Sequence, residues 1–250
     1  MKCTHAKCQH AYESNDVQRR HFLQYLAAGL FAAMWPRGEV LAADSAMLRQ
    51  IPAGRSVFRV SGRAWVNGNR VNLNTPIGPN DTVKTSRDGE LVFVVGNHAM
   101  LLRGGSHLVL RAKEESSETN PVIGLLQLFS GKLLSASRNK GMRIITPSAT
   151  IGVRGTGVYL ETEPDRTYFC TCYGDVDIEA SHDSASKDSV HATHHERPLV
   201  ILNEAQPGSS IRSAKDPEFT RPGRVKLRHS DEELMLIEAL VGRTPPFAPQ

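Results

Sequence analysis

The region from Val57 to Ala180 is a series of short apolar runs separated by turn residues, and none of it has the spacing of an amphipathic helix. Asn67-Gly68 and Asp88-Gly89 lie between such runs, and both dipeptides favour the positive φ angles of tight hairpin turns. About ten short strands at this spacing are typical of a sandwich or roll, not of a parallel α/β sheet. The sequence therefore predicts an all-β fold for this region. The clearest runs are Val57–Val66, Glu90–Val95, Met100–Leu110, Gly124–Phe129, Lys132–Ser137, Ile151–Thr162 and Thr167–Tyr173.

Residues 230–250 have a different pattern. Ser230 and Glu233 have the spacing of a capping box, in which each side chain bonds the backbone N–H of the other residue. Apolar residues follow on one face, Gly242 can end a helix, and Pro245-Pro246 prevent its continuation. We predict an amphipathic helix from Asp231 to Val241, followed by a Pro-rich tail to residue 250. A helix this short is marginal alone, so it should pack on the β domain or on a partner.

The segment between these regions, residues 181–229, is predicted to be an irregular linker. Ser181–His191 is polar and of low complexity, which favours a mobile loop. Leu199–Leu202 could add one more strand, and Gln206–Val225, with its prolines and glycines, should be extended and irregular.

Residues 1–43 contain the features of an export signal in the usual order. Arg19, Arg20, Phe22 and Leu23 resemble the twin-arginine motif, and an Ala-rich apolar run follows them as far as Trp35. That run is shorter than the roughly 20 apolar residues of a membrane span. Ala42 and Ala43 then offer a cleavage site. We expect a periplasmic protein without a transmembrane span after cleavage, and, as the alternative, one anchored in the inner membrane and facing the periplasm. The twin-arginine resemblance implies export in the folded state, often with a cofactor already inserted.

The charge pattern does not favour a nucleic-acid partner. The whole chain has 30 Lys or Arg and 26 Asp or Glu, and residues 1–43 hold five of the basic and three of the acidic residues. The remaining chain therefore has 25 basic and 23 acidic residues, a net charge of +2. These charges are interspersed, whereas nucleic-acid binders usually concentrate basic residues in a block or stripe. We therefore predict no nucleic-acid binding.

Residues 142–157 carry a resemblance to a known family. Their sequence, Met-Arg-Ile-Ile-Thr-Pro-Ser-Ala-Thr-Ile-Gly-Val-Arg-Gly-Thr-Gly, is similar to the signature of the FecR domain, and the likeness extends over residues 57–180. It implies an all-β, jelly-roll-like domain outside the inner membrane, in a family that relays transporter occupancy to a sigma factor. The 18 residues before Arg19 and the Pro-rich end do not match the segments that this relay needs. We expect a free-standing FecR-type module that binds an envelope protein or another extracytoplasmic ligand.

The same motif has a physical interpretation. Pro147 favours extended backbone at Thr146, and the glycines around Val153 and Thr156 permit a bulge or a close backbone approach. Arg154, between Val153 and Gly155, must find carboxylates or carbonyls if it is buried. We favour an arginine that locks two strands together over an anion clamp.

Cys170 and Cys172 are the candidate metal ligands. They are two residues apart on a predicted strand, so both sulfurs should lie on one face. His191, His194, His195 and His229 follow, and two thiolates with one or two imidazoles could hold zinc, or copper or iron if a position stays open. The ligands expected are the two cysteines, then His194 or His195, then His229. The alternatives are buried unliganded thiols, a strained disulfide, and histidines that lie on a surface loop.

The sequence gives little support for an enzyme. It contains no Gly-x-Ser-x-Gly elbow and no His-Glu-x-x-His motif. Asp175 and Asp177 share a strand face, but such carboxylates usually only increase solubility. We predict a non-enzymatic binding or sensing module, and, as the alternative, a metal-binding or redox-active periplasmic protein.

Overall fold

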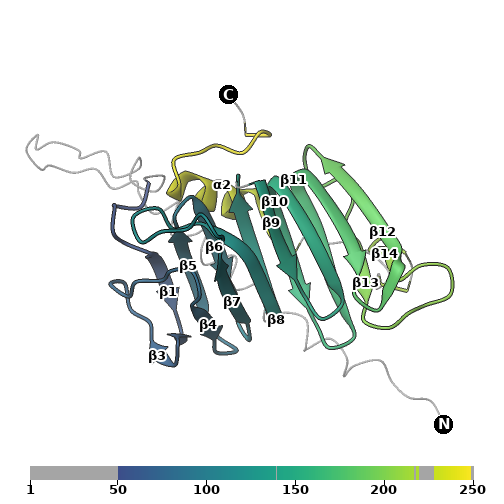
Figure 1. The fold of residues 1–250 in the computed structure, drawn as a ribbon, viewed down its shortest axis with the longest axis horizontal. Helices are drawn as coiled ribbons and strands as arrows, with labels where there is room; N and C mark the ends of the chain where they lie inside the picture. The colour runs from purple at the N-terminus through teal and green to yellow at the C-terminus, as the bar shows by residue number, and fades with distance from the viewer. Residues whose placement is uncertain (1–49, 139, 217, 220–227, 249–250) are drawn as a thin grey trace, which may run out of the picture. The chain divides into compact units, whose positions relative to one another are not determined.

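The computed structural model describes residues 50–248, apart from residues 139, 217 and 220–227. The chain divides into two units, residues 1–43 and 44–250, and the described residues all belong to the second. Arg19, Arg20, Phe22 and Leu23 lie outside the described residues, so the export signal stays a prediction. Among the described residues there are fourteen strands and one helix, drawn in Figure 1.

The strand pairings define two layers. The first layer places strands in the order β3 (Asn69–Arg70), β2 (Ala64–Val66), β4 (Thr82–Thr85), β7 (His107–Ala112), the first half of β8 (Ile123–Ser137), β9 (Lys140–Ile145), the first half of β10 (Ala149–Thr162), the second half of β11 (Arg166–Ala180) and β12 (Asp183–Ala192). The second layer runs β1 (Val57–Ser61), β5 (Glu90–Val95), β6 (His98–Leu102), the second halves of β8 and β10, the first half of β11, β13 (Leu199–Leu202) and β14 (Ile211–Ser213).

Three long strands, β8, β10 and β11, pass from one layer to the other, so both layers belong to one open hydrogen-bonded sheet. Each strand changes layer at a glycine or a bulge. Gly131 in β8 has a φ of +90°, and a Cβ there would lie 2.1 Å from Ser106 Oγ. Gly174 in β11 has a φ of +91°, and β10 has its register shift between Arg154 and Gly157. Only glycine suits such crossings without strain.

The main core fills the space between the two layers. On β5, Leu91, Phe93 and Val95 point into it, whereas Val92 and Val94 point to the outer face of the second layer. Both sets are buried because the C-terminal segment covers this outer face. Burial on two faces explains why β5 and β6 are continuous apolar runs without alternation.

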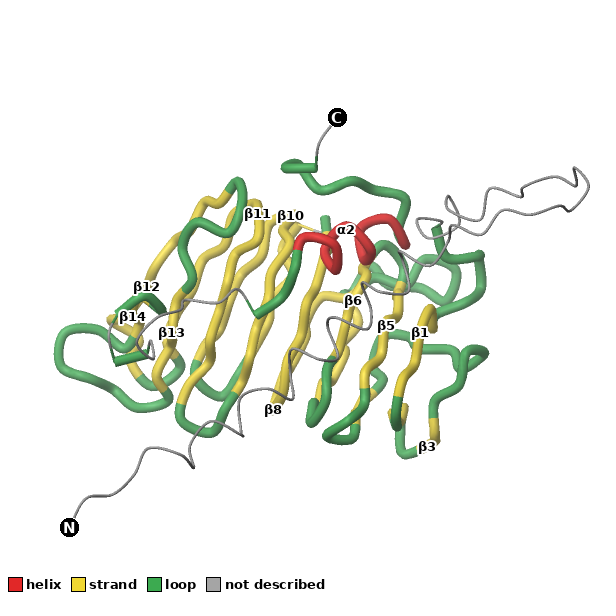
Figure 2. Tube along the Cα trace, turned by 180° about the vertical axis from the view of Figure 1, so that it is seen from behind, coloured by secondary structure: helices red, strands yellow, loops and turns green. Residues whose placement is uncertain are grey.

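The helix α2 (Asp231–Leu240) forms as the sequence predicts. Ser230 caps it with both hydrogen bonds of a capping box, and Gly242 follows with a φ of +68°. Its buried side chains Leu234, Ile237 and Leu240 belong to the cluster on the outer face of the second layer. Seen from behind, α2 lies across the sheet beside β6 (Figure 2). Of the two surfaces expected for this helix, the β domain or a partner, the structure shows it packed on the β domain.

The all-β fold with one C-terminal helix is confirmed, and residues 57–180 form eleven strands where about ten were predicted. Three of these strands are not short: β8, β10 and β11 have 14 or 15 residues because they serve both layers. The predicted linker is wrong. Residues 183–192 form the strand β12 instead of a linker, and the β-structure extends to Ser213 instead of ending at Ala180. Leu199–Leu202 does form a strand, β13.

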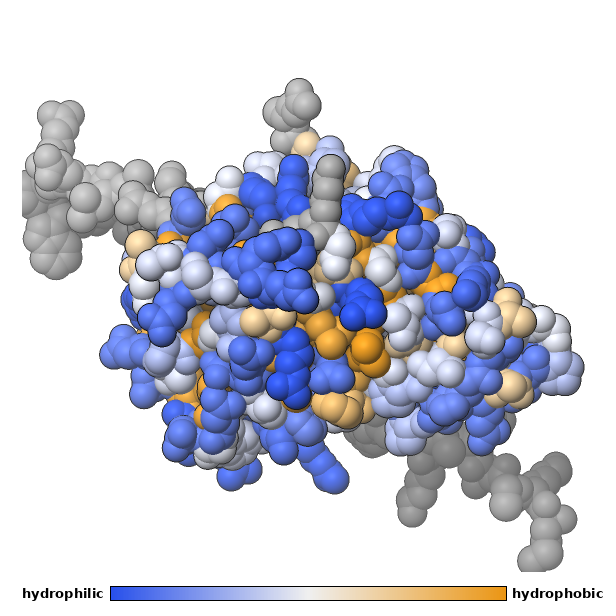
Figure 3. All heavy atoms as spheres, viewed as in Figure 1, coloured by the Kyte–Doolittle hydropathy of each residue, from blue (hydrophilic) through white to orange (hydrophobic). Residues whose placement is uncertain are grey.

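The composition of β12 explains the error. It pairs with β11 on one side, and most of its side chains face solvent, so its residues are polar. In the view of Figure 1 the molecular surface is mostly hydrophilic, with small hydrophobic areas between the charged side chains (Figure 3). Within the described part of the chain, no helix combines the length and apolar character needed to cross a bilayer.

Candidate metal centre

Cys170 and Cys172 lie on β11, on the outer face of the second layer. Both side chains belong to the apolar cluster beneath α2, and both are completely buried. The two sulfurs share a face, as period-two alternation requires. Both are free thiols and not a disulfide.

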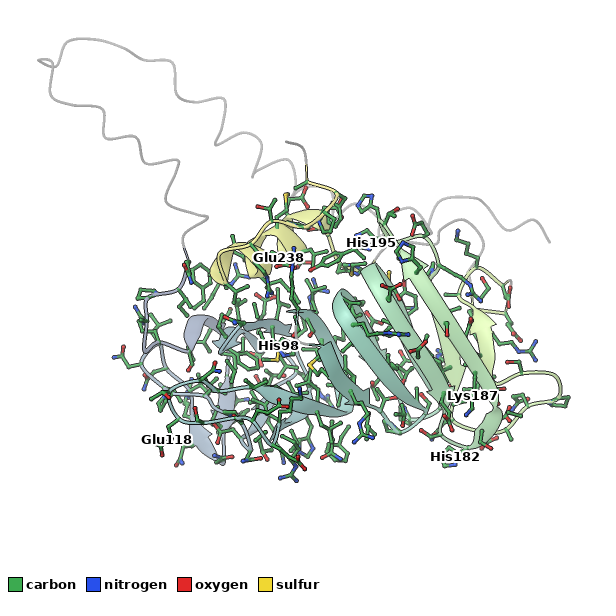
Figure 4. All side chains as sticks on the ribbon, turned by 45° about the horizontal axis from the view of Figure 1, so that its top comes forward. His98, Glu118, His182, Lys187, His195 and Glu238 are labelled. Atoms are coloured by element: carbon green, nitrogen blue, oxygen red, sulfur yellow. The ribbon has the colours of Figure 1, made fainter. Side chains whose placement is uncertain are left out.

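His195 reaches the cysteines from the turn between β12 and β13. Its φ of +54° is in the left-handed region, and its backbone N–H donates to the carbonyl of Cys172 at 3.0 Å. This turn directs the ring back towards β11, where Nδ1 lies 3.6 Å from the Sγ of Cys170. Figure 4 shows His195 at the strand ends, beside the C-terminal segment.

His229 comes from the segment that enters α2. Its Nε2 lies 3.2 Å from the Sγ of Cys172 and 3.2 Å from the Nδ1 of His195. The ring is buried and stacks on Tyr159 at a centroid distance of 4.5 Å. Three separate parts of the chain thus bring two sulfurs and two nitrogens together.

The spacing of these four atoms suits one tetrahedral ion. All of them lie within 4.8 Å of one another. Zinc bonds of 2.3 Å to sulfur and 2.0–2.1 Å to nitrogen place neighbouring ligand atoms about 3.3–3.8 Å apart at tetrahedral angles. The observed separations of 3.2, 3.2 and 3.6 Å are close to this range. A two-sulfur, two-nitrogen donor set is also one that zinc prefers.

Asp231 supports the site from outside. Its Oδ1 lies 2.9 Å from the Nε2 of His195, and because a carboxylate can only accept, Nε2 must carry the proton. The Nδ1 of His195 is then free of a proton when the ring is neutral, and it points at the cysteines. Metal-binding histidines commonly donate to a carboxylate in this way.

His194 and His191 do not join the four. The Nε2 of His194 lies 3.0 Å from both oxygens of Asp231, and its half-exposed ring stacks on Phe247 at 4.2 Å. His191 is exposed on β12, where it lies 2.8 Å from Asp175. Of the five expected ligands, the structure brings together Cys170, Cys172, His195 and His229, and places His194 in an outer group with His195 and Asp231.

The protonation pattern favours metal capture. A hydrogen bond from Cys172, followed by the nearby His195, lowers the pKa of Cys170 to about 6, while burial raises the pKa of Cys172. Burial opposes protonation of His195, but Cys170 and Asp231 outweigh it and raise the pKa. Burial lowers the pKa of His229 to about 3, so this ring is neutral at pH 7. An arriving cation therefore meets the thiolate of Cys170 and the neutral imidazole of His229, and displaces the proton of the Cys172 thiol.

The residues of the 142–157 motif lie away from this centre. Arg154 is exposed and forms an ion pair with Asp177, which joins β10 to β11. Thr146 belongs to a buried hydroxyl network with Ser148 and Thr167. Pro147 lies in the hairpin between β9 and β10, and Val153 lies in the main core. At the bulge, Gly155 has a φ of +68° and Thr156 is buried against Gly174.

Comparisons with known proteins give only distant likenesses. No family model and no curated protein matches the chain. Two crystal structures of a "putative anti-sigma factor" from Parabacteroides distasonis ATCC 8503 are similar in part, with TM-scores of 0.41 and 0.40 and sequence identities of 11% and 12%. Each alignment covers 53% of this chain and 58% of that protein, so the chain spans little more than half the length of those structures. These likenesses are too distant to assign a family.

Proposed function

We propose that this chain is a non-enzymatic binding module that holds one transition-metal ion at Cys170, Cys172, His195 and His229. The observation that carries the proposal is the convergence of four buried ligand atoms from three separate parts of the chain. Of zinc, copper and iron, zinc fits the tetrahedral spacing and the donor set best.

The number of ligands supports a binding role and not a catalytic one. Four protein donors fill a tetrahedral shell, whereas catalytic zinc sites keep one position for water or substrate. The ligands are also buried beneath the C-terminal segment, with Phe247 packed on the outside against His194 and His195. Among the described residues, these contacts cover the ligand atoms from the outside.

The proposed setting is the periplasm. The twin-arginine resemblance around Arg19 and Arg20 supports export in the folded state, which would allow the metal to be loaded before export. The FecR resemblance over residues 57–180 supports a sensing module that engages an envelope protein or another extracytoplasmic ligand. A cleaved signal is proposed, with an inner-membrane anchor as the alternative.

Elemental analysis tests the metal proposal. Full-length chain purified under reducing conditions and loaded with zinc should retain one zinc per chain after dialysis, and Cys172→Ser should retain much less. His191→Ala is the matched control, because His191 is an exposed histidine on the neighbouring strand and touches none of the four ligands. Cobalt substituted for zinc should give the absorption bands of a tetrahedral thiolate site. A chain that retains no metal, or a Cys172→Ser variant that binds as tightly as wild type, would contradict the proposal.

A further inference from the structure

The four ligands divide unequally between the sheet and the C-terminal segment. Cys170 and Cys172 are on β11, and the turn that carries His195 is bonded to the backbone of β11. His229 alone among the four comes from residues 228–248, which we call the strap. An ion held by all four ligands would therefore fasten the strap to the sheet.

The strap covers an apolar face. Leu234, Ile237 and Leu240 of α2 cluster with outward-facing side chains of the second layer, and all are buried. Without the strap, the outward-facing side chains of the second layer would be exposed together as one hydrophobic patch. The sheet residues of this patch are Val92, Val94, Ala99, Leu101, Leu134 and Ala136.

The strap has other polar ties to the sheet. Near its start, Arg228 pairs with the buried Glu161, Asp231 accepts from His195, and Arg103 pairs with Glu233 and donates to the carbonyl of Arg228 at 2.7 Å. Near its end, Arg243 donates to the carbonyls of Asn97 and Ala136 at 3.0 and 3.3 Å. Those of the pairs that are partly exposed contribute little to stability. A ten-residue helix is also marginal when it is not packed.

The ring of His229 is buried, and its Nδ1 has no hydrogen-bond partner within the described residues. An ion at Nε2 would leave Nδ1 without a partner, so this cost favours release of the strap with and without metal. A bond between Nε2 and the ion would oppose that release. The contact between His229 and Cys172 also joins positions 57 residues apart, so an ion there closes a long loop.

From these contacts we infer that the ion regulates the strap: with metal bound, α2 stays docked on the second layer, and on metal loss the strap detaches and uncovers the apolar face. This inference rests on the proposed metal site. By linkage, docking of the strap must also strengthen metal binding by the same factor.

Hydrogen exchange of the full-length chain tests the inference. In the zinc-loaded protein the amides of α2 should be protected, and chelation should speed their exchange at least about tenfold while β5, β6 and β8 stay protected. In His229→Ala, α2 should exchange fast before and after chelation. His182→Ala, which changes an exposed histidine in a turn, should behave as wild type.

A second variant tests the reverse direction of the coupling. Ile237→Ala removes packing beneath α2 without touching a ligand, and it should weaken zinc binding by a factor within the usual allosteric range of about 5 to 150. Equal protection of α2 with and without bound zinc, or unchanged zinc affinity in Ile237→Ala, would overturn the inference and leave the metal site intact. Exchange that becomes fast in every strand on chelation would also overturn it, because the ion would then hold the whole fold. A chain that binds no zinc at all would instead overturn the proposed function.

Discussion

At the scale of single residues, Asp231 matters although it supplies none of the four ligand atoms. It accepts the Nε2 proton of His195, which leaves Nδ1 as the donor to a metal, and it stands in the first turn of α2. It therefore connects the ligand on the β12–β13 turn to the helix that covers the site.

Replacing Asp231 should weaken the metal site without removing a ligand. Asp231→Asn should reduce zinc affinity about 10- to 100-fold, the usual effect of losing a carboxylate behind a metal-bound histidine. Glu232→Gln removes the same charge from the same helical turn and should have little effect. Competition with a chromophoric chelator measures both affinities, and equal affinities in the two variants would show that Asp231 has no special role.

A second residue-scale prediction concerns His98, which is buried in β6 with its Nε2 2.7 Å from the hydroxyl of Ser135. Burial, followed by the charge of Arg243, lowers the pKa of His98 to about 3. The unfolded chain takes up a proton near pH 6.5, whereas the folded chain does not until about pH 3. The stability contributed by neutral His98 is therefore present above pH 6.5 and is lost as the pH falls.

Between pH 7 and pH 5 this single group should cost about 2 kcal/mol of unfolding free energy. Urea unfolding of wild type and His98→Gln at both pH values measures the effect, because every other group contributes equally to both proteins. The pH-dependent loss should be about 2 kcal/mol smaller in the variant. An identical loss in the two proteins would mean that His98 titrates normally in the folded state.

The sequence predicts the site only in part. Alternation along a strand is enough to place Cys170 and Cys172 on one face. The choice between His194 and His195 depends on a turn with a positive φ at His195, and nothing in the local sequence signals that geometry. The role of Asp231 depends on where α2 docks. In the sequence, the only sign that Asp231 belongs to the site is that it lies two residues after His229.

At the scale of elements, the glycines that let long strands change layers are the most constrained positions. Gly131→Ala should destabilise the protein by about 1–2 kcal/mol for its left-handed φ and by a further 1–3 kcal/mol for the clash with Ser106. Gly155→Ala is the matched comparison, because Gly155 also has a positive φ but a Cβ there meets nothing within 4 Å. Chemical denaturation should rank Gly131→Ala as clearly the less stable. Equal stabilities would mean that Ser106 moves away at no cost.

Element types were easier to predict than their partners. The apolar runs indicate strands, and the Ser230 capping box indicates where α2 begins. The pairing of β8 with different strands in its two halves depends on long-range contacts that no local pattern encodes. The polar strand β12 resembles a loop because its stabilisation comes mainly from backbone pairing with β11.

At the scale of the whole molecule, a bound ion should stabilise the folded state by linkage, because the unfolded chain cannot hold the four ligands together. Above the dissociation constant, each tenfold rise in free zinc should raise the unfolding free energy by about 1.4 kcal/mol. Denaturation in zinc buffers measures this slope. His195→Ala should give a slope near zero, whereas a slope shared by the variant would indicate that zinc binds elsewhere.

The shared strands also restrict how a sequence with this fold can diverge. β10 supplies inward side chains to the first layer through Ile151 and Val153 and to the second through Val158 and Leu160. One residue inserted at the start of such a strand would turn apolar side chains outward in both layers at once. Length variation among descendants of this chain should therefore accumulate in the hairpin loops, while β8, β10 and β11 keep a fixed residue count.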